Sequence, residues 1–388
     1  MPVAITAASI VSCVGSTLPE ARKALQDAAS GLKRDHQWLD KIPAPAGVIP
    51  ESWIEDALNA APRNKTLTRL EVITNRLVTE VVTATSLTER YKTRDIGLSI
   101  STTSAGVEHW LGKLTKFGAD WQMTNPKEWF GVKDHGGTLA DSILSHFPFR
   151  GPDVTFSTAC SGGALAIARG AEMIRRGDVK ACIVGGIDIL TSLTMHGFNA
   201  LQVMDHDLCQ PFHPARNGMN LSEGGAFFVL EAKPKDQPLG AVAGYGMATD
   251  FFHMTQPTPT GEPMALCMRR ALDNAGWTPD MVSYVNAHGT GTKANDAAEE
   301  LAIKHVFGAE AFFNSTKAMH GHALAGAGAL EAALTIDALN SQTFFADPRL
   351  PDHVAAPLKA RYAISNSFGF GGHNVSLALS VWTEDHHG

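Results

Sequence analysis

Apolar and polar positions follow two different periods along this chain of 388 residues. Runs of β-branched and apolar residues bounded by Gly, Pro or Asp predict strands, and longer stretches with apolar residues three or four positions apart predict helices. Because strands and helices alternate in both halves, the pattern predicts α/β layers with largely parallel sheets. The predicted strands span residues 3–12, 95–103, 154–159, 180–186, 225–231, 240–247 and 282–286, and the predicted helices span residues 18–29, 67–85, 164–176, 262–275, 296–306 and 323–340.

The stretch from Val154 to Gly186 contains a candidate nucleophile. A strand is followed by the turn Ser-Thr-Ala-Cys-Ser-Gly-Gly, a helix and a second strand, and Gly177 is placed to end the helix in a left-handed cap. Cys160 therefore lies between a strand and the N-terminus of a helix. Free N–H groups and positive potential there are expected to lower the pKa of its thiol and to stabilise a thiolate, as a cysteine nucleophile requires.

The polar, proline-bearing stretch Lys233–Pro238 is the best candidate for a boundary between two halves. We therefore expect an N-terminal unit at residues 1–236 and a C-terminal unit at residues 237–388. The two halves are built alike but share no repeat in sequence. Between Trp110 and Phe147 the chain is rich in Trp, Phe, Gly and Lys, which predicts a loop with a short helix.

Composition argues against several classes of function. The net charge of −7 and the 18% of charged residues provide no basic face for nucleic acid. The sequence holds no run of about 18 apolar residues, so no membrane span is expected. Its first residues alternate like a strand and lack the basic start of a leader peptide. Five dispersed cysteines predict a reduced, cytoplasmic protein without disulfides or a zinc site.

Three further stretches place polar side chains among small residues where a strand ends. They are Asn286–Thr292 with His288, Asn314–His322 with a lysine and two histidines, and Asn366–Asn374 with the sequence Phe-Gly-Phe-Gly-Gly. Taken alone, each has a structural explanation, because a single histidine after a strand usually packs and glycines form tight turns. The small residues in the helix after His322 would let another backbone approach closely.

Together these stretches resemble the β-ketoacyl-acyl carrier protein synthases of types I and II, over nearly the whole chain. The motifs are TACSGG around Cys160, PFHPARNGMNLSEGGA at 211–226, NAHGTGT around His288, STKAMHGH at 315–322 and NSFGFGG at 366–372. The resemblance implies a thiolase-like fold, in which two related βαβαβαββ halves stack into a five-layer αβαβα sandwich. It also implies that the protein works as a dimer.

The resemblance assigns a role to each reactive side chain. Cys160 would take an acyl group from a carrier-protein thioester, and the backbone N–H groups of Cys160 and Phe370 would hold the oxyanion. The Nε2 hydrogens of His288 and His322 would polarise the malonyl thioester carbonyl, so that loss of carboxylate leaves a stabilised enolate. That carbanion would attack the acyl-cysteine and lengthen the chain by two carbons.

Other positions would support this chemistry. Lys317 and Glu331 are expected either to assist the histidines electrostatically or to form a buried structural ion pair. Phe370 would also gate access to the cysteine, and Phe198 would line the acyl pocket. The hydroxyls expected to hold the phosphopantetheine arm are those of Thr255, Thr290 and Thr292.

The implied reaction is the decarboxylative Claisen condensation of malonyl-acyl carrier protein with an acyl group on Cys160, without a metal or a cofactor. The implied partners are an acyl carrier protein and a second ketosynthase-like subunit, either a copy of this chain or a chain-length-factor-like protein. Small polar residues at Ser101–Gly106, and Met219 in place of a common Phe, predict an altered acyl channel. A polyene, aryl polyene or type II polyketide pathway is therefore as well supported as fatty-acid elongation.

Three other protein classes share parts of this pattern. A thiolase needs a second cysteine near the C-terminus, and none follows Cys267. A type III synthase would carry Asn in place of His322. A non-catalytic, chain-length-factor-like subunit resembles this chain throughout but loses the active cysteine, and it stays open as the alternative function.

Overall fold

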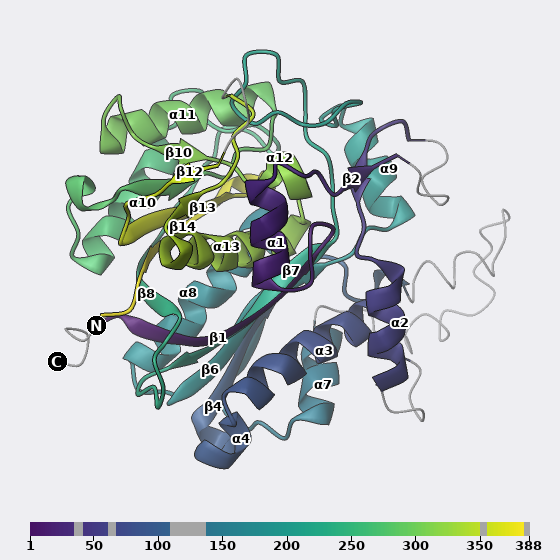
Figure 1. The fold of residues 1–388 in the computed structure, drawn as a ribbon, viewed down its shortest axis with the longest axis vertical. Coiled ribbons are helices and arrows are strands. Elements are labelled where there is room, and N and C mark those ends of the chain that lie inside the picture. The colour runs from purple at the N-terminus through teal and green to yellow at the C-terminus, as the bar shows by residue number, and fades with distance from the viewer. Residues whose placement is uncertain (35–41, 61–66, 109–136, 350–354, 384–388) are drawn as a thin grey trace, which may run out of the picture.

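The structure is a computed structural model that describes residues 1–34, 42–60, 67–108, 137–349 and 355–383. It shows a large twisted sheet with helices packed on both sides (Figure 1). Most of the loop expected between Trp110 and Phe147 lies outside the described residues, and the part that follows forms a helix. Among the described helices, none is long and apolar enough to cross a membrane.

Ten strands form one mixed sheet in the order β10-β9-β13-β14-β8-β1-β7-β6-β4-β5. Two short antiparallel pairs, β2 with β3 and β11 with β12, lie apart from it. The strands are Val3–Ser12 (β1), Leu32–Lys33 (β2), Ala46–Gly47 (β3), Ile96–Ser101 (β4), Asp153–Phe156 (β5), Ala181–Asp188 (β6), Gly224–Glu231 (β7), Gly240–Thr249 (β8), Tyr284–Asn286 (β9), Phe313–Asn314 (β10), Thr343–Phe344 (β11), Ala356–Pro357 (β12), Tyr362–Phe368 (β13) and His373–Ser380 (β14).

The large sheet consists of two halves with the same topology. In the first half β1 is antiparallel to β7 and β7 to β6, whereas β6, β4 and β5 are parallel. In the second half β8, β14, β13, β9 and β10 repeat these directions in the same order. The halves join where residues 3–5 of β1 pair with residues 240–242 of β8. The boundary predicted after residue 236 falls in the connection between β7 and β8.

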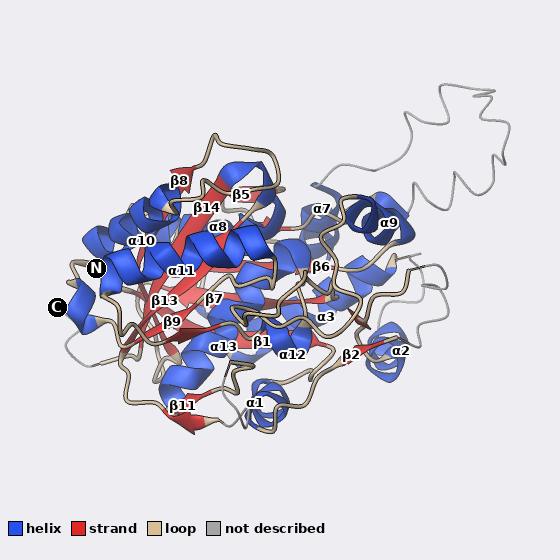
Figure 2. Cartoon of the chain, turned by 90° about the horizontal axis from the view of Figure 1, so that it is seen from above, coloured by secondary structure: helices blue, strands red, loops and turns tan. Residues whose placement is uncertain are grey.

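The helices form three layers around the two half-sheets, stacked from top to bottom in Figure 1. Seen from above in Figure 2, α11 lies in front of the strands. α3 and α7 cover the outer face of the first half, α10 and α11 cover the outer face of the second, and α8 and α13 lie between them. The described helices are Leu18–Gln26 (α1), Glu51–Ala60 (α2), Arg69–Ala84 (α3), Leu87–Arg90 (α4), Gly137–His146 (α7), Gly162–Arg175 (α8), Ser192–Ala200 (α9), Glu262–Ala275 (α10), Lys293–Phe307 (α11), Lys317–His320 (α12) and Ala327–Ser341 (α13).

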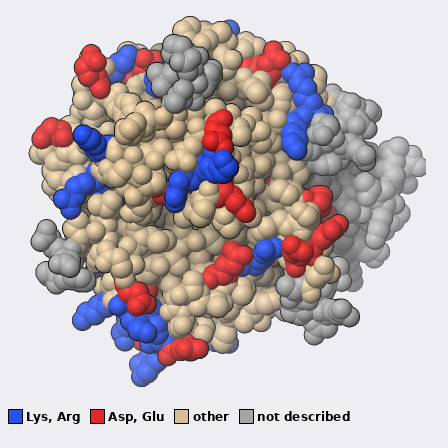
Figure 3. Space-filling model, in the orientation of Figure 1, with Lys and Arg blue, Asp and Glu red and all other residues tan. Residues whose placement is uncertain are grey.

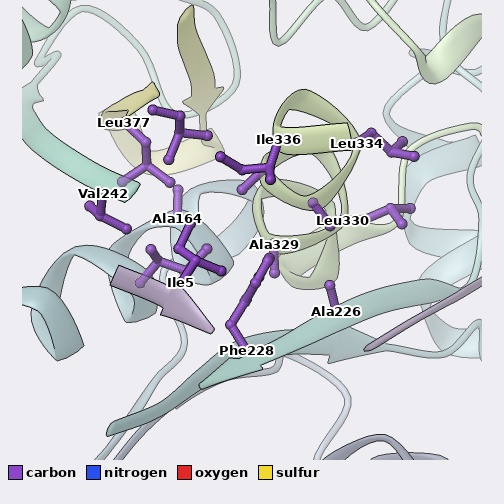
Figure 4. Close-up of a cluster of buried hydrophobic side chains, with 14 of the residues drawn as sticks. Ile5, Ala164, Ala226, Phe228, Val242, Ala329, Leu330, Leu334, Ile336 and Leu377 are labelled. Carbon is purple, nitrogen blue, oxygen red and sulfur yellow. The ribbon is translucent and has the colours of Figure 1, made fainter. Parts of the chain in front are cut away.

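The middle layer forms the main core, in which α13 is buried along almost its whole length. Figure 4 shows Leu330, Leu334 and Ile336 of α13 among side chains from both half-sheets, including Phe228 and Leu377. Burying apolar side chains on all sides of a helix is the normal solution for a central layer. The expected five-layer α/β sandwich is therefore confirmed.

Local sequence accounts for most helix ends. At α3, the Thr68 hydroxyl accepts a hydrogen bond from the Glu71 N–H, and the Glu71 carboxylate accepts one from the Thr68 N–H, which is a capping box. Gly177, with φ +76°, ends α8 as predicted.

Several expectations were wrong. The sheet is mixed rather than largely parallel, because β1, β7, β8 and β14 pair only in antiparallel fashion. α1 ends at Gln26 rather than Ala29, α8 begins at Gly162 rather than Ala164, and α9 was not predicted.

Glycine at the start of α8 follows from close packing. A Cβ on Gly163 would lie 2.7 Å from the Ala329 backbone nitrogen, and one on Gly328 of α13 would lie 2.8 Å from the Ala164 backbone nitrogen. The two central helices therefore touch backbone to backbone, which only glycine permits. This confirms the close approach expected from the small residues after His322.

Charged side chains of both signs are interspersed on the face drawn in Figure 3, around a broad uncharged area. No continuous basic stripe is visible on that face. This distribution agrees with the expectation from the net charge of −7.

Candidate active site

The reactive side chains follow the carboxyl ends of four strands. Cys160 follows β5, His288 follows β9, Lys317 follows β10 and Phe370 follows β13. His322 lies between α12 and α13, where its backbone N–H donates to the Asn220 carbonyl. Residues from both halves of the chain thus meet in one place, as ligand and catalytic residues of α/β proteins commonly do at strand ends.

They meet in a pocket of about 350 Å³, within the usual range for small-molecule sites. Eight of the ten predicted site residues line it, and the remaining two, Lys317 and Glu331, lie behind it. The lining residues of that set are Cys160, Phe198, Thr255, His288, Thr290, Thr292, His322 and Phe370.

The thiol and the two histidines form a compact cluster. The Cys160 sulfur and one ring nitrogen of each histidine all lie within 4.8 Å of one another. The two imidazole rings are nearly perpendicular, at 85°, with centroids 5.3 Å apart. All three residues are at most 5% exposed, so the cluster is shielded from bulk water.

Hydrogen bonds assign the tautomer of each ring. The Leu324 N–H donates to His322 Nδ1 at 3.0 Å, so the hydrogen of His322 is on Nε2. His288 Nδ1 lies 3.4 Å from the Lys317 ammonium, which can only donate, so its hydrogen is also on Nε2. Burial and the Lys317 charge lower the pKa of both histidines well below its usual value, which keeps both rings neutral.

This pattern favours donation over metal binding. A metal on Nε2 would require its hydrogen to move to Nδ1, but both Nδ1 atoms already accept hydrogen bonds. His322 Nε2 is buried and has no partner among the described residues. Its N–H is therefore available to a group that enters the pocket.

The Cys160 thiol differs from the expectation. Burial raises its pKa to about 11, although the Phe370 N–H, the Lys317 charge and its own N–H act in the opposite direction. Desolvation of a thiolate at this depth outweighs the two N–H donors and the Lys317 charge. The shift is still the smallest of the five cysteines, since Cys13, Cys209 and Cys267 reach about 12.

A pH series tests this value. With a thiol pKa of about 11, iodoacetamide should label Cys160 at a rate that rises about tenfold per pH unit from pH 7 to pH 9, because only the thiolate reacts. The measurement is mass spectrometry of the Cys160 peptide. A small free thiol in the same tube serves as the control, since its rate should begin to level near its own pKa. A Cys160 rate that is already level at pH 8 would contradict the raised pKa.

Two backbone N–H groups converge on the Cys160 sulfur, those of Phe370 and of Cys160 itself. Gly371 adopts φ +82°, which the glycine-rich turn supplies and which suits this placement. The Phe370 ring stacks on Phe198 at 5.8 Å. The paired rings line the pocket together with the thiol and pack against the apolar cluster that contains Met219.

Lys317 and Glu331 form an ion pair, and both are essentially unexposed. The Lys317 ammonium also donates to the His288 carbonyl oxygen at 2.5 Å. Burial raises the pKa of Glu331 to about 7, with Lys317 acting in the opposite direction. Lys317 and Glu331 thus form a buried ion pair. Because Lys317 also contacts the His288 ring and carbonyl, the pair can position that ring.

The three predicted threonines all line the pocket. Thr290 and Thr292 bond to each other through their hydroxyls at 2.9 Å. The Thr255 hydroxyl lies 3.3 Å from His253 Nδ1. Thr290 is buried, and Thr255 and Thr292 are half-buried.

Sequence reasoning missed the carboxylates that hold the His288 loop. Glu299 of α11 accepts hydrogen bonds from the N–H groups of His288 and Gly289 at 2.7 and 2.8 Å. Asp296, one turn earlier, accepts from the N–H of Thr290 at 3.0 Å. Two acidic residues three apart in a helix directly after a Gly/Thr turn are the signal that could have identified them.

The chain matches known families over most of its length. Residues 1–236 match the family model "Beta-ketoacyl synthase, N-terminal domain", and residues 239–348 match "Beta-ketoacyl synthase, C-terminal domain". A 3-oxoacyl-(acyl-carrier-protein) synthase 2 from Coxiella burnetii is 37% identical over 271 residues, which cover 62% of this chain and 65% of that protein. Its counterpart from Vibrio harveyi is 38% identical over 262 residues, covering 61% and 63%. The matched region thus spans less than two thirds of each relative.

Solved structures resemble the whole chain. One is the ketosynthase ApeO in complex with its chain length factor ApeC from Xenorhabdus doucetiae, with a TM-score of 0.80, 27% identity and 98% of each chain covered. Another is the ishigamide ketosynthase/chain length factor, with a TM-score of 0.87, 25% identity and coverage of 98% and 99%. A beta-ketoacyl synthase from Burkholderia phymatum has a TM-score of 0.84 at 26% identity, with coverage of 98% and 100%. The expected thiolase-like ketosynthase fold is confirmed.

Proposed function

Since this chain belongs to the beta-ketoacyl synthase family, we propose that it condenses malonyl-acyl carrier protein with an acyl group held on Cys160, with loss of CO2, to give a β-ketoacyl-acyl carrier protein. One observation carries this proposal. The Cys160 sulfur and two neutral imidazoles lie within 4.8 Å of one another in a buried pocket, and the His322 N–H facing it has no partner among the described residues.

The first step is transfer of the acyl group. The Cys160 sulfur attacks the thioester carbonyl of acyl-carrier protein, the oxyanion accepts hydrogen bonds from the N–H groups of Cys160 and Phe370, and the carrier thiol leaves with the proton. A resting thiol of raised pKa needs these donors, because they stabilise negative charge on sulfur and on the carbonyl oxygen that it attacks.

The second step is decarboxylation and carbon–carbon bond formation. The malonyl thioester carbonyl accepts hydrogen bonds from the Nε2–H groups of His288 and His322, so the electrons released with CO2 are held as an enolate. The enolate carbon attacks the acyl-Cys160 carbonyl, and the Cys160 thiolate leaves. Neutral imidazoles suit this step because they donate hydrogen bonds without protonating the carbanion.

Both substrates would arrive on phosphopantetheine, the arm of an acyl carrier protein, and the reaction would use no other cofactor. The three threonines that line the pocket would bind this arm. Lys317 and Glu331 would position His288 from behind. Phe370, stacked on Phe198, would open and close the passage from the thiol to an acyl pocket.

The identity of the second subunit has two candidates. Two of the similar structures are ketosynthases with chain length factors, which supports a heterodimer as well as a homodimer. The same likeness favours, as a second candidate function, a chain-length-factor-like subunit. Retention of Cys160 with both histidines favours the catalytic role.

The pathway and compartment are also proposals. Of the positions expected to alter the acyl channel, Met219 lines the pocket, whereas Ser101–Ser104 do not. The apolar cluster of Met195, Met204 and Met219 beside Phe198 supports an acyl channel suited to polyene, aryl polyene or polyketide chains, alongside fatty-acid elongation. Five free cysteines in the described part of the chain support a cytoplasmic protein.

Mass spectrometry tests the proposed function. The protein is mixed with a panel of acyl-carrier proteins, then with malonyl-carrier protein, alone and with a candidate chain-length-factor subunit. We expect acyl mass on the Cys160 peptide and a product two carbons longer. Acyl loading without elongation until the second subunit is added would indicate a heterodimer. A folded protein that loads no acyl group in either arm would overturn the catalytic proposal in favour of the non-catalytic alternative.

A further inference from the structure

Asp188 is a fully buried carboxylate at the carboxyl end of β6, outside the lining of the pocket. It has no cationic partner in the described part of the chain; instead it accepts six hydrogen bonds from neutral donors. Burying a carboxylate that has only neutral donors costs free energy. We therefore expect Asp188 to have a role that offsets this cost.

The two oxygens of Asp188 hold different segments. Oδ1 accepts from the segment after β4, namely Thr102 Oγ1 at 2.7 Å, the Thr103 N–H at 2.8 Å, and the Ser104 N–H and Oγ at 2.9 and 2.8 Å. Oδ2 accepts from Thr103 Oγ1 at 2.5 Å and from the Ala325 N–H at 2.8 Å. Only Oδ2 therefore reaches the turn that follows His322.

That turn is strained and closely packed. Leu324 has φ +51°, a left-handed conformation that is unfavourable for a residue with a Cβ. A Cβ on Gly326 would lie 2.0 Å from the Gly224 carbonyl oxygen, so the turn lies directly against the start of β7. The Ala325 N–H, bound to Asp188, comes immediately after the strained residue, and the Leu324 N–H is the donor to His322 Nδ1.

We propose that Asp188 is a positioning residue for His322, which acts through the Ala325 N–H to hold Leu324 in the conformation that donates to His322 Nδ1. This inference rests on the proposed function, because it concerns which His322 nitrogen presents a hydrogen to the malonyl carbonyl. Without the hold, Leu324 relaxes, the bond to Nδ1 weakens, and the ring is free to carry its hydrogen on either nitrogen.

A carboxylate suits this task better than an amide. Both oxygens of a carboxylate accept, so one can serve the Thr102–Ser104 segment while the other serves Ala325. In Asp188→Asn, the side-chain oxygen can keep the four donors on the Oδ1 side. The amide NH2 then faces the Ala325 N–H, and two donors meet. This nearly isosteric change removes the one contact that the proposal requires.

The first experiment examines the wild-type protein and uses a variant only to assign the signals. In full-length protein labelled with 15N in the histidine rings, with His322 assigned by comparison with His322→Ala, nitrogen NMR reports which ring nitrogen carries the hydrogen. We expect His322 to be neutral with hydrogen on Nε2 and a bare Nδ1. Hydrogen on Nδ1 would overturn the proposal irrespective of any activity.

The second experiment compares Asp188→Asn with two controls. Ser104→Ala removes a donor to Oδ1 and leaves the Ala325 bond intact. Asp337→Asn breaks a partly buried ion pair with Arg22 that lies away from the pocket. It controls for any effect of a general loss of stability on the two activities. Acyl loading of Cys160 and condensation are measured separately for each, together with the His322 nitrogen signals and the melting temperature.

We expect Asp188→Asn to lower condensation about 10- to 100-fold, because loss of a positioned donor of this kind has that effect. Acyl loading should change by less than about threefold, since it uses the thiol and the oxyanion donors. The His322 signals should shift toward a mixture of tautomers in this variant alone. Equal loss of loading and condensation, or unchanged His322 signals, would overturn the proposal, whereas wild-type protein that does not condense would overturn the proposed function instead.

Discussion

Replacing Cys160 with alanine is expected to abolish acyl loading and to lower condensation at least about 10³-fold, because the variant lacks the sulfur that forms the acyl intermediate. The sulfur is the point on which the Phe370 and Cys160 N–H groups converge, and the neighbouring imidazoles are neutral hydrogen-bond donors that cannot replace it. The measurement is the mass of the Cys160 peptide after incubation with acyl-carrier protein, followed by product analysis with malonyl-carrier protein.

Cys182→Ala is the matched control for this variant. Cys182 is also fully buried, but it lies inside β6 and its thiol bonds only to a backbone carbonyl in the described chain. We expect it to retain loading and condensation after a modest loss of stability from the vacated volume. Elongation by Cys160→Ala at more than a few per cent of the wild-type rate would refute the assignment of Cys160.

Replacing His322 with alanine is expected to separate the two steps. Condensation should fall about 10²- to 10³-fold, the usual effect of removing one donor to a developing oxyanion. Acyl loading should stay within a few-fold of wild type, because the thiol and its two N–H donors are unchanged. Radiolabelled malonyl-carrier protein measures CO2 release and product formation, and the mass of acyl-Cys160 measures loading in the same sample.

Two further variants define what this result means. His322→Asn keeps a side-chain N–H donor and should recover part of the condensation rate. His320→Thr alters the neighbouring buried histidine, which bonds to Thr316 and does not line the pocket, and it should leave the ratio of the steps unchanged. If His322→Ala lowers loading as much as condensation, then His322 is needed for the fold of the pocket and not for enolate formation.

The periodic segments were predictable and the irregular ones were not. The helix predicted at 262–275 is α10, and the one predicted at 67–85 is α3, which begins at Arg69 after its capping box. α9 was missed because Met195 is its one buried side chain, so its sequence shows no amphipathic period. The five-layer arrangement came from the resemblance, because the two halves repeat their topology without repeating their sequence.

The site also has features that could be predicted from the sequence and features that could not. Motifs around Cys160, His288 and His322 name the reactive groups, and the structure places all three in one pocket. Motifs do not report desolvation, so the direction of the thiol pKa was wrong. They also do not report which distant backbone groups a carboxylate meets, and for that reason Glu299 and Asp188 were missed. Such contacts join segments up to 137 residues apart and exist only after folding.

The pairing of β1 with β7 and β8 sets an order for synthesis of the chain. β1 is made first, but its partners lie at residues 224–231 and 240–242. At about 5–20 residues per second, a ribosome needs roughly 10–45 s to make the residues between them. During that time Val3, Ile5 and Ile10, all buried in the finished protein, have no strand to pair with. The nascent chain must therefore carry an unpaired apolar strand until most of the protein has emerged, a period in which a holding chaperone would prevent aggregation.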